Sequence, residues 1–165
     1  MEIPVYVFTG FLDSGKTKFI QETLEDSRFN SGESTLMLLL EDGEEELDFS
    51  RFPKGSRVYI EKITNKEELS PKFLEALRKK HKAVRVLLEC NGMWNIEDIY
   101  GAFPRDWVPA QEISLADANT ILSYNSNMRN LVVNKLSTCE MVIFNRMDDS
   151  TDKMALHKLV RGVSR

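Results

Sequence analysis

Several features are missing or scarce in this sequence, and each absence excludes a class of protein. With two cysteines among 165 residues, the chain has no disulfide framework and no cysteine-rich zinc site. Its longest aliphatic run covers residues 36–40, whereas a membrane-spanning helix needs roughly 20 apolar residues. Residues 1–4 lack the basic start and the apolar stretch of a signal peptide. We therefore expect a cytoplasmic protein that is not inserted in a membrane.

An excess of positive charge is also absent. Lys and Arg together number 22, and Asp and Glu number 26, which gives a formal net charge of −4. Proteins dedicated to nucleic acids usually present a basic face, so we expect no nucleic-acid partner. Hydrophobic residues make up 42% and charged residues 29%, which is typical of a globular chain. The length suits one domain, residues 1–165, with its own core.

Apolar segments alternate with helical patterns along the chain. Strands are predicted over residues 3–9, 35–40, 57–63, 84–88, 112–115 and 141–144. Helices are predicted over residues 16–26, 70–82, 94–100, 117–137 and 152–160. This alternation predicts an α/β fold of three layers, with a mostly parallel central sheet flanked by helices. Ligands of such sheets bind beyond the carboxyl ends of the strands, so the residues after each strand are the functional candidates.

The first predicted strand leads into a phosphate-binding loop. Residues 10–17 read Gly-Phe-Leu-Asp-Ser-Gly-Lys-Thr and match G-x-x-x-x-G-K-[ST] at every fixed position. The loop amides and the helix N-terminus of such a motif face an anion. Lys16 would reach the β- and γ-phosphates of a nucleotide, and Thr17 would bind Mg²⁺. The predicted nucleotide-binding residues of this loop are Gly10, Asp13, Ser14, Gly15, Lys16 and Thr17.

A carboxylate and a glycine follow the fourth predicted strand, in the sequence Glu-Cys-Asn-Gly of residues 89–92. Beside a phosphate loop, Glu89 would support the Mg²⁺ shell or position water. Gly92 would let its amide approach a γ-phosphate, because it has no side chain in the way. Without the phosphate loop, the same pattern would indicate only a strand-ending Glu and a turn Gly.

The last predicted strand ends in residues 145–148, Asn-Arg-Met-Asp, close to the N-K-x-D motif of GTPases. The carboxylate of Asp148 would accept two hydrogen bonds from guanine, and such a site rejects adenine, which lacks that donor pair. Asn145 would brace the loops, and Arg146 would lie along the base in place of Lys. Residues 134–137 also begin with Asn-Lys, but Ser stands where Asp is needed and the segment is predicted to be helical.

With these three motifs in this order, the chain resembles the CobW/HypB/UreG family of P-loop GTPases, and most closely its CobW-like branch. Residues 7–17 are close to that branch's phosphate loop, Glu89 and Gly92 match its second motif, and residues 145–148 match the third with one substitution. Asp117-Ala118 after a strand resembles a further family feature. The resemblance spans nearly the whole chain.

This resemblance implies a GTP-binding domain that hydrolyses GTP slowly with Mg²⁺ and uses the switch to deliver a metal or cofactor. Its catalytic residues would be Lys16, Thr17 and Glu89. No convincing arginine finger or Gln is visible in cis, so intrinsic turnover is expected to be slow, and a partner or a homodimer would complete the site. The implied partners are guanine nucleotide, a client metalloprotein or C-terminal domain, and a second copy forming a homodimer.

The sequence departs from CobW-like proteins in two ways. Such proteins often carry a C-x-C-C metal motif after the second strand, whereas this chain has no cysteine before Cys90. Family members also usually continue with another strand and a C-terminal domain. We therefore expect this chain to be the N-terminal part of a longer protein.

An acidic segment lies where the family places its first switch. Residues 41–48 contain six acidic side chains in eight positions. Charges this dense repel one another, so an ordered conformation needs a cation or a nucleotide–Mg²⁺ complex. We hypothesise that Glu41 or Asp42 contributes to the Mg²⁺ site or positions water, and that the segment orders on GTP binding. The alternative is a solvated, mobile loop.

Two other functions fit parts of the sequence. A nucleotide-binding regulatory module without useful hydrolysis is compatible with the poorly matched first switch. A P-loop kinase acting on a small molecule would need an arginine-rich lid and an acceptor pocket, and the motif at residues 145–148 argues against it.

Overall fold

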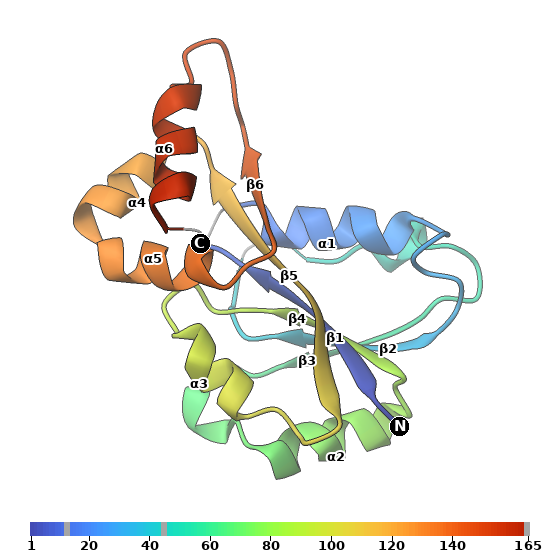
Figure 1. Ribbon diagram of the computed structural model, residues 1–165. Helices are drawn as coiled ribbons and strands as arrows, with labels where there is room; N and C mark the ends of the chain where they lie inside the picture. Colours follow the sequence, from blue (N-terminus) through green and yellow to red (C-terminus); the bar gives the residue numbers. More distant parts are fainter. Residues whose placement is uncertain (12–13, 44–45, 164–165) are drawn as a thin grey trace.

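The protein is built around a parallel sheet of six strands, seen in a computed structural model that describes residues 1–11, 14–43 and 46–163. The strand order is β3-β2-β4-β1-β5-β6, and every neighbouring pair is parallel (Figure 1). The strands are β1 (Ile3–Thr9), β2 (Ser34–Leu39), β3 (Arg57–Lys62), β4 (Arg85–Glu89), β5 (Trp107–Asp117) and β6 (Met141–Asn145). The helices are α1 (Lys16–Glu25), α2 (Pro71–His81), α3 (Ile96–Gly101), α4 (Ile121–Asn127), α5 (Arg129–Ser137) and α6 (Lys153–Val163), with short 3₁₀ helices η1 (Phe49–Arg51) and η2 (Lys66–Glu68).

Alternating side chains along the strands build a core on each face of the sheet. Val5 and Val7 of β1 join the core formed with α2 and α3, whereas Phe8 joins the core formed with α1. Figure 1 shows α1 on one face and α2 and α3 on the opposite face, with α4, α5 and α6 grouped near β6. The predicted three-layer fold is therefore confirmed, and the sheet that the structure describes is parallel throughout.

Strand β2 shows why a continuous apolar run forms a central strand. Its neighbours are β3 and β4, and both of its faces are covered by helices. Leu36 and Leu38 pack on the α2 side and Met37 on the α1 side, and all three are fully buried. A strand buried on both faces needs apolar residues at successive positions, which is the pattern in the sequence.

The predicted helix over residues 117–137 is wrong in its extent. Residues up to Asp117 belong to β5, and the helical part is divided at Met128, whose φ is −136° and ψ is 50°. The segment contains neither Gly nor Pro to signal this break. Asn125, Ser126 and Asn127 precede it, and such residues are poor helix formers because their side chains bond to nearby backbone. In α4 itself, Ser126 donates to the carbonyl of Leu122.

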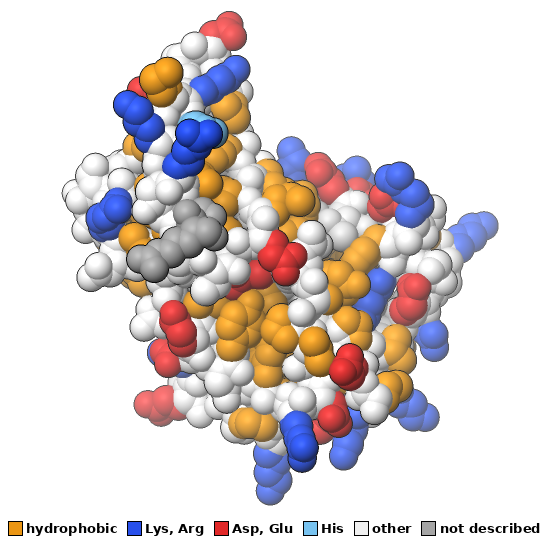
Figure 2. Space-filling model, viewed as in Figure 1, with side chains coloured by type: hydrophobic (Ala, Val, Ile, Leu, Met, Phe, Trp, Pro, Cys, Tyr) orange, Lys and Arg blue, Asp and Glu red, His pale blue; other side chains and the backbone are white. Residues whose placement is uncertain are grey.

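Strand β5 is longer than the predicted strand over residues 112–115. It begins at Trp107 and pairs with β1 along its length, with a shift of register between Val5 and Tyr6. Pro109, Ala110 and Gln111 give this part no apolar pattern, so its backbone pairing, rather than its side chains, makes it a strand. Apolar side chains lie exposed in the middle of the face drawn in Figure 2, where Figure 1 places β5 and β1.

None of the described helices combines the length and the apolar character that crossing a bilayer would require.

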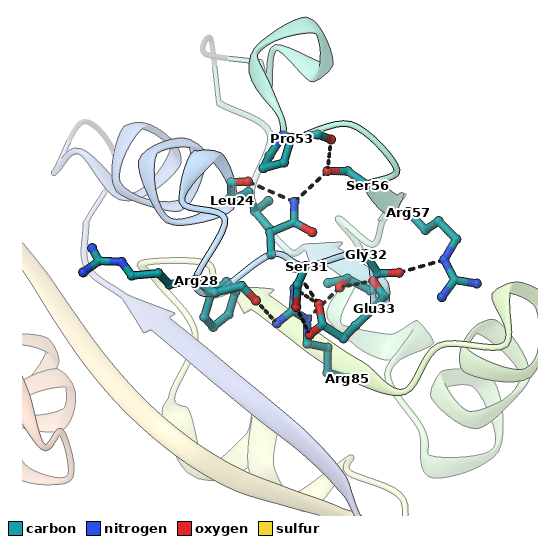
Figure 3. Close-up of polar contacts among 12 residues, drawn as sticks. Leu24, Arg28, Ser31, Gly32, Glu33, Pro53, Ser56, Arg57 and Arg85 are labelled. Atoms are coloured by element: carbon teal, nitrogen blue, oxygen red, sulfur yellow. Dashed lines mark hydrogen bonds and ion pairs between the residues drawn. The ribbon is translucent and has the colours of Figure 1, made fainter.

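A buried polar cluster fixes the amino ends of β2 and β4, at the edge of the sheet opposite the phosphate loop (Figure 3). The guanidinium of Arg85 donates to the Thr35 hydroxyl and to the Phe29 carbonyl, each at 2.7 Å, and lies 4.2 Å from the Phe29 ring centroid. Burial lowers the pKa of Arg85, and the Glu33 carboxylate 3.6 Å away opposes that shift. Nearby, the Asn30 amide donates to the Leu24 carbonyl and to the Ser56 hydroxyl. These bonds tie the end of α1 to the start of β2 and β3.

We expect Arg85→Ala to lower the free energy of unfolding by about 3 kcal/mol, because it leaves the Phe29 carbonyl and the Thr35 hydroxyl without their donor. Arg57→Ala is the matched control, since Arg57 is exposed and, among the described residues, donates only to the Gly32 carbonyl. It should lower the free energy by less than about 1 kcal/mol. Urea denaturation measures both, and equal losses would contradict this role for Arg85.

Candidate functional site

The carboxyl ends of five strands bring the candidate residues to one edge of the sheet. The phosphate loop follows β1, Glu41 follows β2, Glu89 ends β4, Asp117 ends β5, and Asn145 ends β6. Because these strands are parallel, residues that are distant in the sequence meet at this edge. The site is therefore assembled by the sheet, and each loop supplies one or two groups.

Two glycines allow the loops to approach one another closely. Gly15 has a φ of 93°, and a Cβ atom there would collide with the Asn145 side-chain amide. At Gly92 a Cβ atom would lie 2.8 Å from the Gly10 carbonyl oxygen and 2.9 Å from the Phe11 Cα atom. Both glycines are thus required by packing of the loops, and Gly92 places the segment after β4 directly against the phosphate loop.

The ammonium of Lys16 is buried inside this loop cluster. The side chain is 3% exposed, and its Nζ donates to the Gly10 carbonyl at 2.5 Å and to the Phe11 carbonyl at 3.1 Å. It also forms an ion pair with the Glu41 carboxylate at 2.6 Å. The loop therefore curls around its own lysine.

Glu41 contacts both the Lys16 ammonium and the Gly92 backbone N–H. While Oε2 pairs with Lys16, Oε1 accepts a hydrogen bond from the Gly92 backbone N–H at 3.2 Å. These are the two groups that the sequence predicts for a γ-phosphate. The hypothesis named Glu41 or Asp42, and the structure separates them: Asp42 is 76% exposed and lies 3.8 Å from the surface Lys62 ammonium.

Thr17 and Glu89 form the second pair of the site. The Thr17 hydroxyl donates to Oε1 of Glu89 at 3.0 Å, and Glu89 is 5% exposed. A hydroxyl beside a carboxylate supplies the hard oxygen ligands that Mg²⁺ prefers, and few protein ligands suffice because water and phosphate complete its octahedron. The residues therefore fit an Mg²⁺ ion. Among the described residues, no group of three or more His, Cys, Asp or Glu forms a metal-binding cluster.

Asn145 joins the third motif to the phosphate loop. Its Nδ2 donates to the Ser14 carbonyl at 2.5 Å, and a contact of this kind is what the predicted bracing role requires. The next residue, Arg146, has a φ of 59°, and its guanidinium pairs with Asp117 at 2.5 Å. Gly15, Lys18, Phe19, Glu22, Asn145 and Arg146 line a cavity of about 340 Å³. This cavity lies beside the start of α1, next to the phosphate loop.

Asp148 lies at the surface, in the turn before α6. Its Oδ1 accepts hydrogen bonds from the Ser150 N–H and hydroxyl and from the Thr151 hydroxyl. These bonds, first of all those from Ser150, lower its pKa, so Asp148 is a carboxylate at neutral pH. All three bonds go to one oxygen, so a ligand can approach the other.

One charged residue near the site was missed in the sequence. Lys135 of α5 is 5% exposed, and its ammonium lies 4.8 Å from the centroid of the Phe11 ring. The Phe11 ring also stacks on the ring of Tyr124, with the two ring centroids 4.2 Å apart. The burial of Lys135 could have been predicted from its position between Val132 and Leu136, because a lysine beside apolar helix positions is a candidate for burial.

The structure thus brings together Gly10, Ser14, Gly15, Lys16, Thr17, Glu41, Glu89, Gly92 and Asn145. It places Asp42 away from this group and Arg146 against Asp117. Asp13 lies outside the described residues, as do Glu44 and Glu45 of the acidic segment.

We expect Glu41→Gln to lower the free energy of unfolding of the nucleotide-free protein by about 3 kcal/mol, because it leaves the buried Lys16 ammonium without its counter-charge. Asp42→Asn is the matched control at the adjacent position, with an expected loss below about 0.5 kcal/mol. Urea denaturation without nucleotide and Mg²⁺ measures both. Similar values for the two variants would argue against the ion pair.

Comparison with solved structures shows the same fold. The Zn(II)-bound YjiA GTPase from E. coli superposes with a TM-score of 0.67 at 18% identity, over 97% of this chain and 54% of that one. FlhF in complex with GMPPNP and Mg²⁺ gives 0.56 at 14% identity, over 99% and 64%. The hydrogenase maturation factor HypB from Archaeoglobus fulgidus gives 0.51 at 17% identity, over 97% and 70%. The chain thus spans about half the length of the YjiA structure.

Comparison of sequences gives the family. No curated protein matches the chain. The family model described as "CobW/HypB/UreG, nucleotide-binding domain" matches residues 4–165, which include the phosphate loop, the segment after β4 and the motif after β6. The chain therefore belongs to the CobW/HypB/UreG family and carries its nucleotide-binding domain.

Proposed function

We propose that this chain is a cytoplasmic GTP-binding domain that hydrolyses GTP slowly with Mg²⁺, within a protein that delivers a metal or cofactor. The observation that carries the proposal is the hydrogen bond from Asn145 to the Ser14 carbonyl. It joins a phosphate loop to an N-R-x-D motif, so that one nucleotide can reach both. The cavity beside Gly15 and Asn145 lies between these two elements and has room for a nucleoside.

The reaction is transfer of the γ-phosphoryl group to water, in which positioning and charge neutralisation supply most of the catalysis. Lys16 binds the β- and γ-phosphates after Glu41 leaves its ammonium, and the Gly92 N–H donates to the γ-phosphate. Thr17 and Glu89 would hold the Mg²⁺ ion. When bound, Mg²⁺ neutralises charge on the phosphate oxygens. Asp148 accepts hydrogen bonds from guanine, and Arg146 packs along the base.

The delivery role rests on family membership. Among the solved structures of the same fold, one is a Zn(II)-bound GTPase and another is a hydrogenase maturation factor. This chain has no cysteine before Cys90, so zinc binding by a C-x-C-C motif is not part of the proposal. The proposed partners are a client metalloprotein or a C-terminal domain, and a second copy that completes the site.

A regulatory module that binds nucleotide without useful hydrolysis is the second candidate. The ion pair between Glu41 and Lys16 favours it, because a nucleotide must first displace a carboxylate from the lysine that catalysis needs. Measured turnover separates the two candidates. Tight GTP binding with no release of phosphate, in the presence of Mg²⁺ and a client, would favour the module.

Asp148→Asn tests base recognition. The side-chain oxygen of Asn can still accept the hydrogen bonds from Ser150. Its NH2 group, however, would face the N–H donors of guanine, and two donors cannot form a hydrogen bond with each other. We expect GTP affinity to fall at least about tenfold and ATP affinity to stay unchanged. The neighbouring exposed Asp149→Asn is the control and should change neither. Calorimetric titration with Mg²⁺ measures these affinities. Equal binding of GTP and ATP by the unaltered protein would remove the GTPase proposal.

Thr17→Val tests the proposed Mg²⁺ site, since valine keeps the shape of the side chain and removes the hydroxyl. We expect the rate of Mg²⁺-dependent GTP hydrolysis to fall roughly 10- to 100-fold. Thr23→Val on the same helix is the control, because the Thr23 hydroxyl donates only to the Phe19 carbonyl within α1. Phosphate release, measured across an Mg²⁺ titration, is the readout. An unchanged Mg²⁺ dependence in Thr17→Val would exclude this ligand.

A further inference from the structure

Lys135 is a buried cation without an anionic partner among the described residues. Its side chain, on α5, is only 5% exposed. Among the residues that the structure describes, no hydrogen bond or ion pair reaches its ammonium, which lies 4.8 Å from the centroid of the Phe11 ring. A ring face compensates an ammonium only in part, so burial without an anion is unfavourable for this group.

Helix α5 is fixed against the segment that follows Gly92. The Asn134 side chain accepts a hydrogen bond from the Ile96 N–H at 3.0 Å and donates to the Glu97 carboxylate at 2.7 and 2.9 Å. These bonds attach α5 to the first turn of α3. Lys135 is the next residue, and its contact with Phe11 places it beside the phosphate loop. The lysine therefore lies beside the phosphate loop, on a helix that is bonded to the start of α3.

Lys135 interacts electrostatically with the charged residues of the site. Burial, and next the charge of Lys16, lower the pKa of Lys135 to about 8, whereas Cys90 and Glu41 oppose this shift. Lys135 is thus an electrostatic neighbour of the ion pair between Lys16 and Glu41. That single carboxylate is already engaged by Lys16 and by the Gly92 N–H.

We propose that Lys135 is a second phosphate-binding cation of this site, which contacts the terminal phosphate of a nucleoside triphosphate. This inference rests on the proposed function, because it takes the triphosphate as the ligand. When the terminal phosphate replaces the Glu41 carboxylate, it brings up to two negative charges and three acceptor oxygens, where the carboxylate brings one charge and two oxygens. Lys16 and Lys135 can then share one anion.

The assignment gives the site a way to distinguish GTP from GDP. Lys16 contacts both the β- and the γ-phosphate, so its loss weakens both nucleotides. Lys135 contacts the γ-phosphate alone, so its loss weakens the triphosphate selectively. A residue that merely supported the packing of α5 would affect both nucleotides to the same extent.

The test compares Lys135→Met with the unaltered protein in calorimetric titrations of GDP and of a non-hydrolysable GTP analogue, both with Mg²⁺. We expect affinity for the GTP analogue to fall roughly 10- to 100-fold, as for loss of a charged hydrogen bond, and GDP affinity to change less than about threefold. The nucleotide-free variant should melt at a higher temperature, because methionine removes a buried charge that has no counter-ion among the described residues. Lys72→Met, on the exposed surface of α2, is the control for loss of a lysine.

The outcomes separate this assignment from the proposed function. If the unaltered protein binds both nucleotides and Lys135→Met loses affinity for both equally, or for neither, the role of Lys135 is wrong and the GTP site stands. If the unaltered protein binds neither nucleotide, the proposed function and this assignment both fail. Should Lys135→Met not fold, Lys135→Gln, which keeps a polar head group and removes the charge, is expected to show the same selective loss and is judged in the same way.

Discussion

The burial of the Lys16 ammonium is the constraint on which the site depends. A cation at 3% exposure needs acceptors on every open side, and it finds the carbonyls of Gly10 and Phe11 and the carboxylate of Glu41. To bring the Gly10 and Phe11 carbonyls to the Lys16 ammonium, the phosphate loop must fold back over the start of α1. The carboxylate requires the chain after β2 to cross to the loop after β1, with β4 between these two strands. The Gly92 N–H then meets the same carboxylate, so one buried charge orders three loops.

The parts predicted from the sequence are those that local pattern determines. The strands β1, β2 and β4 are continuous apolar runs, and the phosphate loop is a contiguous motif, so both could be found without the fold. The sequence could not show whether Glu41 or Asp42 lies at the site, because adjacent acids have the same chemistry. Only the position where β2 ends decides which of the two faces Lys16. The division of the helix at Met128 depends on tertiary packing. The burial of Lys135 also depends on tertiary packing, since the helix pattern shows which residues neighbour Lys135 in α5 but not that the Phe11 ring covers it.

The third motif shows how a substitution can keep one role and alter another. Asn145 makes the contact that braces the loops, and that contact needs only the amide and the close approach at Gly15. Arg146 stands where GTPases carry Lys, and its guanidinium is held by Asp117, while the Asn119 amide donates to its carbonyl. A guanidinium fixed by a carboxylate presents a flat face more firmly than a free ammonium stem, because its fork geometry suits a carboxylate. Arg146, held by Asp117, therefore forms part of the wall of the proposed base site.

The charges around the loop also bear on how such a domain could act as a switch. A ligand shifts a conformational equilibrium only by as much as it binds the two states differently. Here the contact that a nucleotide would have to replace is the ion pair of Lys16 with Glu41, the first residue of a segment with six acids in eight positions. A phosphate that takes over Lys16 returns that carboxylate to its acidic neighbours, where like charges repel. At its far end the segment is held by Gln21 of α1, which bonds both the N–H and the carbonyl of Asp48. A nucleotide that displaced Glu41 from Lys16 would therefore break one of these contacts and leave the contacts of Asp48 in place.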